Sequence, residues 1–211
     1  MKLRVDNVAT LNTEVVLVFK ENLETLVANT KCPNSKALLE RQIFKAKAGE
    51  ILPLLHGEKT VLLVGLGKAE DFMLSEFYRA VASACSQLKQ LNISDVSVNI
   101  DYMLEKTSDA KQLACEVVRN FISESYGFEQ LKSEKSEYSL VEVEVVYSGD
   151  VDVEESMKIG SAIALGQNYA KDLQNLPANI CDTEYMVNEA RELTEKYETF
   201  TRDYLGEKEM A

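Results

Sequence analysis

The chain has 211 residues, of which 45% are hydrophobic and 27% charged, with only 3 Pro and 9 Gly. This balance is typical of a globular protein and excludes the collagen-like, disordered and low-complexity classes. The formal net charge of −12 lies almost wholly in the second half, because residues 1–100 carry 12 basic and 11 acidic side chains and residues 101–211 carry 11 and 24. Such a surface repels phosphate backbones, which argues against a dominant nucleic-acid role for the second half.

The first 150 residues alternate between strand and helix patterns. Two nearly continuous apolar runs are typical of strands buried on both faces, and two alternating runs are typical of strands with one face in water. The predicted strands are residues 14–19 and 60–65 of the first kind, and 95–100 and 141–147 of the second. Apolar side chains at helical spacing predict helices over residues 77–91 and 113–121, and a weaker one over 34–47. This order predicts an α/β fold, a layered mixed sheet flanked by helices.

The pattern changes after Tyr147. Residues 148–152 form a turn-rich break, and helical patterns follow over 153–173 and 183–196. Asp182 stands directly before the last helix as its predicted N-cap, since a carboxylate accepts the free amides of a first turn. We therefore expect one domain over residues 1–150 and a helical segment over residues 151–211.

A pair of glycines follows the second predicted strand. Gly65 and Gly67 precede a helix, which is where a phosphate-binding loop lies in nucleotide-binding folds. The third glycine of a Gly-x-Gly-x-x-Gly motif is replaced by Glu70, and no Gly-Lys-Ser/Thr follows. A tight turn explains the two glycines equally, so both interpretations stay open.

Residue types that carry catalysis or bind metals are sparse. His56 is the only histidine, and there is no Cys-x-x-Cys, Gly-x-Ser-x-Gly or His-Glu-x-x-His. The four cysteines are Cys32, Cys85, Cys115 and Cys181. Cys85 and Cys115 fall on the apolar stripes of predicted helices, where a free thiol packs as a small hydrophobe, and His56 is predicted in a loop as a structural or solvent-facing side chain. We therefore predict no catalytic, cofactor-binding or metal-binding residue in this chain.

The chain also lacks signals for export. Its first residues contain no apolar stretch behind the basic side chains, and no apolar run approaches the roughly 20 residues of a membrane span. With no paired cysteine motif, a reducing compartment is expected. The predicted location is cytoplasmic, without membrane contact.

The most specific segment joins the two last predicted helices. Residues 166–185 read as a helix end, an Asn-x-Pro-x-Asn connection and a new helix start, and Pro177 ends the first helix. An ordinary helix–loop–helix joint has the same outline, but the string resembles the opening of the catalytic domain in the leucine aminopeptidase (cytosol aminopeptidase) family. The matching positions are Lys171, Asp172, Leu173, Asn175, Pro177, Asn179, Glu184 and Tyr185. Asp182 and Thr183 depart from the Thr-Pro that is common there, although Asp keeps the capping chemistry.

Two softer similarities lie upstream of this motif. Residues 61–68 look like the strand and turn of the family's N-terminal domain, and residues 118–133 are similar to its Tyr-x-Phe-x-x-x-Lys-Ser stretch near the domain junction. The resemblance thus covers most of the chain in order.

The resemblance carries expectations about fold and function. Its members join a macro-domain-like N-terminal domain to a catalytic domain in which Lys, Asp and Glu hold two divalent metal ions, Mn or Zn. The metals activate a water that attacks the peptide bond next to a free N-terminus. The family's Asn-Thr-Asp-Ala-Glu-Gly-Arg motif is not found here. The resemblance therefore implies an accessory domain over residues 1–150 and the truncated start of a metallopeptidase domain over 151–211.

Further expectations follow for the molecule as a whole. The intact protein is expected to remove N-terminal amino acids from peptides and to form a homo-oligomer, a hexamer. This chain is expected to be inactive, to bind no metal, and to serve in positioning and oligomer contacts.

Two alternatives of other classes stay open. Macro domains bind ADP-ribose beside strand ends, and Gly65 and Gly67 are the candidate cradle for such a ligand. Some bacterial members also bind DNA, and the near-neutral first half carries one local basic cluster. Its members are Lys31, Lys36, Arg41, Lys45 and Lys47. A solvated helix face explains the same cluster, and the overall charge argues against DNA.

Overall fold

The computed structural model describes residues 1–29, 41, 43–107, 109–136 and 138–206. Within these residues the strands are β1 (Lys2–Asp6), β2 (Thr13–Val18), β3 (Ile51–His56), β4 (Lys59–Gly65), β5 (Asp95–Asn99) and β6 (Glu142–Val146). The helices are α1 (Leu23–Asn29), α3 (Leu74–Gln90), α4 (Asp101–Thr107), α5 (Ala110–Glu124), α6 (Glu154–Asn175) and α7 (Thr183–Lys196). Two 3₁₀ turns are also present, η1 (Lys20–Asn22) and η2 (Ala69–Asp71).

The six strands form one mixed sheet in the order β1-β6-β5-β2-β4-β3. All neighbours are parallel except β3, which pairs antiparallel with β4 at the edge. Parallel neighbours require crossover connections, and helices supply them here. The expected α/β fold with a layered mixed sheet flanked by helices is confirmed.

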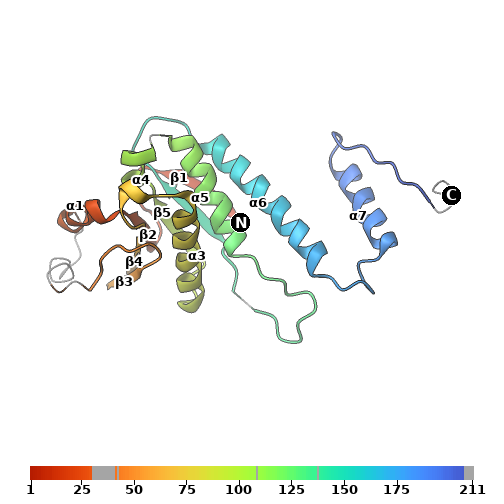
Figure 1. The fold of residues 1–211 in the computed structure, drawn as a ribbon, viewed down its shortest axis with the longest axis horizontal. Coiled ribbons are helices and arrows are strands. Elements are labelled where there is room, and N and C mark those ends of the chain that lie inside the picture. The colour runs from red at the N-terminus through yellow and green to blue at the C-terminus, as the bar shows by residue number, and fades with distance from the viewer. Residues whose placement is uncertain (30–40, 42, 108, 137, 207–211) are drawn as a thin grey trace. The chain divides into compact units, whose positions relative to one another are not determined.

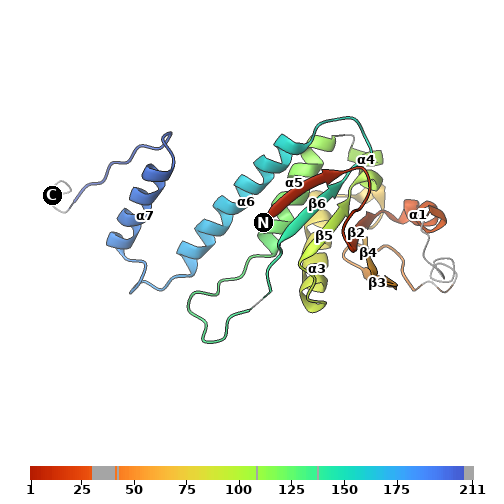
Figure 2. The same cartoon turned by 180° about the vertical axis from the view of Figure 1, so that it is seen from behind.

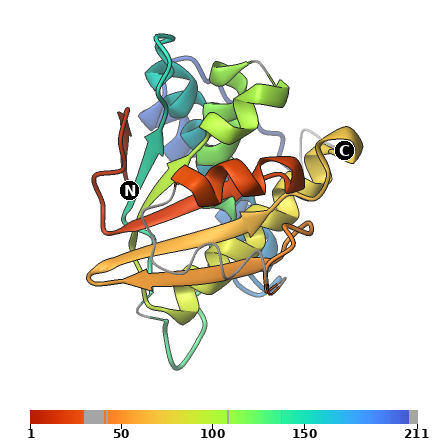
Figure 3. The ribbon, with the colours of Figure 1, turned by 90° about the vertical axis from the view of Figure 1, so that its left-hand side faces the viewer.

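The two faces of the sheet are covered differently. Helices α3, α5 and the first part of α6 cover one face (Figures 1 and 2), where Val15 and Leu17 of β2 pack into the main core. The alternate residues Val16 and Val18 point to the opposite face and pack with Leu23 of α1. Figure 3 shows α1 lying over that second face of the sheet. Because both faces of β2 are buried, its near-continuous apolar sequence is explained.

Helices α5 and α6 approach each other closely at a glycine. A Cβ atom on Gly160 would lie 2.3 Å from the carbonyl oxygen of Cys115, a backbone atom that has little freedom to move. On either side of Gly160, Met157 and Ala164 are buried in the main core. The close contact therefore depends on the missing side chain at position 160.

The chain divides into two compact units, residues 1–167 and residues 168–211. The boundary between domains that the sequence predicts, at residue 150, rests on the change of pattern there and stays a prediction. Among the described residues, no helix combines the length and apolarity needed to cross a bilayer.

The structure contains the strands predicted from the sequence and further elements that were not predicted. All four predicted strands are present, and the two well-defined helices predicted before residue 150 correspond to α3 and α5. Strands β1 and β3 and helices α1 and α4 were not predicted, and β3 contains Pro53, which an edge strand tolerates. The weak helix predicted over 34–47 falls partly on residues 34–40 and 42, which lie outside the described residues. Residues 43–47 are not helical, so the prediction is wrong there.

Candidate functional site

A crevice of about 550 Å³ opens beyond the carboxyl ends of β2 and β4. We call it the lysine crevice, because four lysines contribute to its lining. The lining residues are Lys20, Leu23, Glu24, Phe44, Lys45, Ala46, Lys47, Gly67 and Lys68. Lys20 lies two residues after the end of β2 and Lys68 three residues after the end of β4, so the local sequence places both residues at the same edge of the sheet.

The position of the crevice follows from the topology. Strand β2 leads into α1, which packs on one face of the sheet, whereas β4 leads into α3, which packs on the other. When the chain leaves two adjacent parallel strands toward opposite faces, a gap opens outside their carboxyl ends. In open α/β sheets, ligands bind at such points.

The glycine turn after β4 forms the floor of the crevice through backbone contacts. A Cβ on Gly65 would lie 2.2 Å from the carbonyl oxygen of Lys47, so residues 46 and 47 approach only because position 65 has no side chain. Gly67 has φ +80°, a left-handed conformation that favours glycine. Gly65 is the last residue of β4 and Gly67 follows it in a left-handed conformation, so both glycines are explained by the backbone geometry at the strand end.

The amides of this turn are already used within the protein. The Gly65 amide donates to the carbonyl oxygen of Glu50 at 2.8 Å, and the Leu66 and Gly67 amides donate to those of Val18 and Ala46 at 2.9 and 2.8 Å. A phosphate cradle of the kind expected for the ADP-ribose alternative needs free amides pointing at the ligand. At residues 65–67 none is free, so these three amides do not form such a cradle.

The charges around the crevice are unequal. Lys20, Lys45 and Lys47 have exposed side chains and no acidic partner among the described residues. Lys68 pairs with the exposed Glu70 at 3.0 Å, and the hydrogen bond to that carboxylate raises the pKa of Lys68. Glu24 is the acid among the described lining residues, so lysines outnumber acids on the described lining, although the carboxylates of Glu50 and Glu70 lie beside it.

The segment that carries two of these lysines is held by a carboxylate. The Glu50 side chain accepts hydrogen bonds from the amides of Lys45 and Lys47 at 3.1 and 2.9 Å. These bonds involve the backbone, which leaves the lysine side chains unconstrained. Both lysines belong to the basic cluster described above for the first half of the sequence. Of its other members, Arg41 is exposed, and Lys31 and Lys36 lie outside the described residues.

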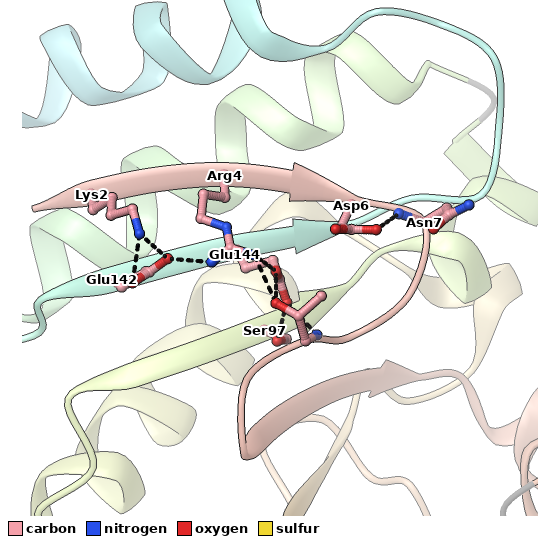
Figure 4. Close-up of polar contacts among 8 residues, drawn as sticks. Lys2, Arg4, Asp6, Asn7, Ser97, Glu142 and Glu144 are labelled. Carbon is pink, nitrogen blue, oxygen red and sulfur yellow. Dashed lines mark hydrogen bonds and ion pairs between the residues drawn. The ribbon is translucent and has the colours of Figure 1, made fainter.

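A second polar group lies on the face of the sheet that carries Val16 and Val18 of β2. Residues Arg4, Glu144 and Ser97 stand side by side on β1, β6 and β5, and the same row continues to Glu14 on β2. Figure 4 shows Arg4, Glu144 and Ser97 pointing toward one another on this face. Strand 141–147 was expected to have one wet face, but Glu144 is fully buried. The strand register explains this burial, because it places Arg4 of β1 and Ser97 of β5 on either side of Glu144. Thr10, from the segment after β1, is a further partner.

Glu144 has a complete set of hydrogen-bond donors. The Arg4 guanidinium donates to one carboxylate oxygen at 3.1 Å, and the Thr10 amide donates to the other at 2.8 Å. The hydroxyls of Thr10 and Ser97 donate as well. Burial works to raise the pKa of Glu144, but the hydrogen bonds from Ser97 and Thr10 and the charge of Arg4 outweigh it and hold the pKa below its usual range. The group is a structural carboxylate, fully paired within the protein.

This lowered pKa predicts a pH-dependent loss of stability. A carboxyl group whose pKa is lower in the folded than in the unfolded state stabilises the fold above the unfolded value, and that contribution disappears as pH falls through the folded value. We expect the free energy of unfolding, measured by urea denaturation, to fall between about pH 5 and pH 3. Glu14 also titrates abnormally, because burial raises its pKa, so the contribution of Glu144 must be isolated with a variant. Glu144→Gln should lose less free energy of unfolding over the same pH range. An equal loss in both proteins would contradict the assignment to Glu144.

The motif at 171–185 joins α6 to α7 within the second unit. The Pro177 carbonyl accepts hydrogen bonds from the amides of Ile180 and Cys181, both at 2.9 Å. The Asp182 carboxylate accepts from the Tyr185 amide at 2.8 Å, which confirms the predicted N-cap of the last helix. The joint is thus fixed by a proline turn and a capped helix start.

The four cysteines and His56 are the remaining residues that the sequence analysis above considers as candidates. Cys85 is buried in the main core, where burial raises the pKa of its thiol to about 12, and Cys115 is half-buried. Cys181 is also a free, half-buried thiol, and Cys32 lies outside the described residues. His56 is exposed but ends strand β3, so its predicted loop position is wrong. In the described part of the chain, no three His, Cys, Asp or Glu side chains are grouped as metal ligands.

Comparison with known sequences places this chain among aminopeptidases. Residues 15–135 match the model of the cytosol aminopeptidase family, N-terminal domain. A "Probable cytosol aminopeptidase" of Pasteurella multocida is 28% identical over the whole of this chain, which corresponds to 45% of the relative. A protein of the same description from Nitrosomonas eutropha is 33% identical over 74% of this chain and 33% of its own length. The chain therefore spans less than half the length of these relatives.

Solved structures show the same fold. A mutant of tomato leucine aminopeptidase superposes over the whole chain, and over 45% of its own, with a TM-score of 0.83 at 16% identity. The bottromycin maturation enzyme BotP in complex with Mn covers 88% of this chain and 36% of its own, with a TM-score of 0.66 at 21% identity. Because the family model matches more than half of the residues, this chain belongs to the cytosol aminopeptidase family.

Proposed function

We propose that this chain is the N-terminal part of a metal-dependent leucyl aminopeptidase, which removes N-terminal amino acids from peptides in the cytoplasm. Residues 1–150 form the accessory domain, and residues 151–211 begin the metallopeptidase domain. The observation that carries the proposal is the similarity to cytosol aminopeptidases along the entire chain, with the N-terminal-domain model matching residues 15–135. The Asn-x-Pro-x-Asn joint at 175–179 supports the position of the second domain.

The chemistry belongs to the part of the relatives that this chain does not span. Two divalent ions, Mn or Zn, would serve the peptidase as Lewis acids. The described residues do not fit such a pair of ions, because they offer no cluster of three acidic, histidine or cysteine ligands. We therefore assign no catalytic or metal-binding residue to this chain, and propose that residues 1–150 act in positioning and in contacts within a hexamer.

Exposed apolar side chains within residues 151–211 support packing of this segment against further protein. On α6, Ile159, Ile163 and Leu165 are all more than two-fifths exposed. In the second unit the exposed apolar side chains are Ile180, Met186, Tyr197, Phe200, Tyr204 and Leu205. Isolated exposed apolar residues are normal on a protein surface, but such a concentration over 47 consecutive positions indicates surface that packs against further protein.

An assay with leucyl-p-nitroanilide and added Mn²⁺ or Zn²⁺ tests the assignment of the chemistry. We expect the purified 211-residue protein to release no nitroaniline above the metal-only blank, because no described cluster fits the metals. A full-length leucine aminopeptidase such as the tomato enzyme serves as the positive control. Turnover by this chain that a chelator abolishes would overturn the proposal that it lacks the active site.

A further inference from the structure

We propose that the lysine crevice binds a small phosphorylated molecule. The described residues of the site are 20, 23–24, 44–47 and 67–68, and the binding does not depend on the aminopeptidase proposal. Its starting point is the coincidence of three features: a crevice of about 550 Å³, a position where α/β sheets bind ligands, and a lining with four lysines. Nothing in the peptidase reaction accounts for that combination.

The charges on the lining favour a multiply charged anion. The described lining residues include four lysines and one acid, Glu24, and Lys20, Lys45 and Lys47 form no ion pair with an acid among the described residues. Glu70 pairs with Lys68, and the Glu50 carboxylate binds the amides of Lys45 and Lys47. A concave surface of one sign focuses the electrostatic potential and raises the local concentration of opposite charges. Bound phosphate would gain from these lysines without first breaking an ion pair, except at Lys68.

The type of cation is compatible with phosphate. The described lining residues include lysines and no arginine. Lysine acts as a compact point charge with three donors and is a common phosphate ligand. Because the amides of residues 65–67 are used internally, the recognition proposed here comes from the lysine side chains.

The size and floor of the crevice favour a small molecule over a polymer. Its volume falls within the roughly 300–1,000 Å³ typical of small-ligand pockets. Leu23, Phe44 and Ala46 are buried beneath the crevice, and the alkyl stems of the four lysines add apolar surface above them, which suits a carbon or ring portion attached to the phosphate. We therefore expect an organic phosphate to bind more tightly than inorganic phosphate.

Titrations of the 211-residue protein with inorganic phosphate, phenyl phosphate and pyrophosphate test the proposal. In ¹H–¹⁵N spectra we expect saturable shifts centred on residues 44–47 and 67–68, with phenyl phosphate binding several-fold more tightly than inorganic phosphate. Phenol alone should give no saturable shift. Raising the salt from 50 to 200 mM should weaken binding, since the contacts are between exposed charges.

Two variants with opposite expected effects separate binding from folding defects. Lys45→Gln combined with Lys47→Gln should weaken pyrophosphate binding by about ten-fold or more, because two ammonium groups are lost from the lining. Glu24→Gln removes the opposing charge and should tighten binding by roughly two- to five-fold. As the matched control, Lys89→Gln combined with Lys132→Gln removes the same charge outside the crevice and should leave the affinity unchanged. Thermal unfolding midpoints of all variants should stay close to that of the wild type.

Any of three results would overturn the proposed site. These are no saturable shifts with any phosphate compound, equal weakening in the control double variant, and unchanged affinity in Lys45→Gln/Lys47→Gln. Tight binding of a 20-base-pair DNA duplex that is lost in the Lys45→Gln/Lys47→Gln variant, without saturable binding of pyrophosphate, would show a nucleic-acid surface instead of a small-molecule site.

Discussion

Replacing Glu144 with Ala should lower the free energy of unfolding by about 3–5 kcal/mol, the cost typical of breaking a buried charge network from one side. The carboxylate is fully buried and accepts hydrogen bonds from Arg4, Thr10 and Ser97. Without it, the Thr10 amide and the Ser97 hydroxyl lose their acceptor, and Arg4 loses one of its two carboxylate partners. Urea or thermal denaturation of the purified variant measures the loss.

The neighbouring residue Glu142 provides the control. It lies two positions earlier on β6 and pairs with Lys2 and Arg4, both at 3.2 Å, but Lys2 is largely exposed. Ion pairs near the surface contribute at most about 1 kcal/mol, so Glu142→Ala should have a much smaller effect. If the two substitutions cost the same, the burial of Glu144 would not be the source of its contribution.

The second large effect is expected at the contact between α5 and α6. Gly160→Ala should destabilise the protein by roughly 1–3 kcal/mol, the usual cost of overpacking, because the new methyl group would lie 2.3 Å from the Cys115 carbonyl oxygen. The helices must then separate, which weakens the packing of Met157 and Ala164 in the main core. The midpoint of chemical denaturation reports the change.

The same helix contains a glycine that should respond in the opposite direction. A Cβ on Gly166 would meet nothing within 4 Å. Because glycine costs a helix roughly 0.5–1 kcal/mol relative to alanine, Gly166→Ala should stabilise the protein by about that amount. Two identical substitutions six residues apart thus differ in sign. A stabilising Gly160→Ala would refute the close approach of α5 to α6.

Much of the fold could be predicted from the sequence, because hydrophobic periodicity reports burial directly. Val15 to Val18 are apolar in succession, and both faces of β2 are covered in the structure. The helical spacing of Phe77, Val81 and Leu88 likewise corresponds to the buried face of α3. Strand β1 escaped prediction because it has only two core-packed apolar residues, Leu3 and Val5, and its pairing with β6 spans 140 positions.

The lysine crevice was visible in the sequence only in pieces. From the sequence, Gly65 and Gly67 indicate either a tight turn or a phosphate-binding loop after a strand, and Lys45 and Lys47 belong to a basic cluster, but no sequence feature links the two observations. The two features come together because residues 46 and 47 pack against Gly65 and the Gly67 amide donates to the Ala46 carbonyl oxygen. These contacts exist only in the folded chain. Lys20 and Lys68 could have been found as the first charged residues after two buried parallel strands.

The sequence by itself determined the alternation of strands and helices, the capped helix start at Asp182 and the resemblance to aminopeptidases, because these depend on local pattern and short motifs. Only the tertiary structure decided the order of the strands, the buried state of Glu144 and the existence of the lysine crevice. These features depend on which distant segments become neighbours, and strand register and crossover direction set that. The net charge of −12 is a sum over the whole chain, whereas a binding site depends on charge at one place, where folding has gathered four lysines around a single crevice.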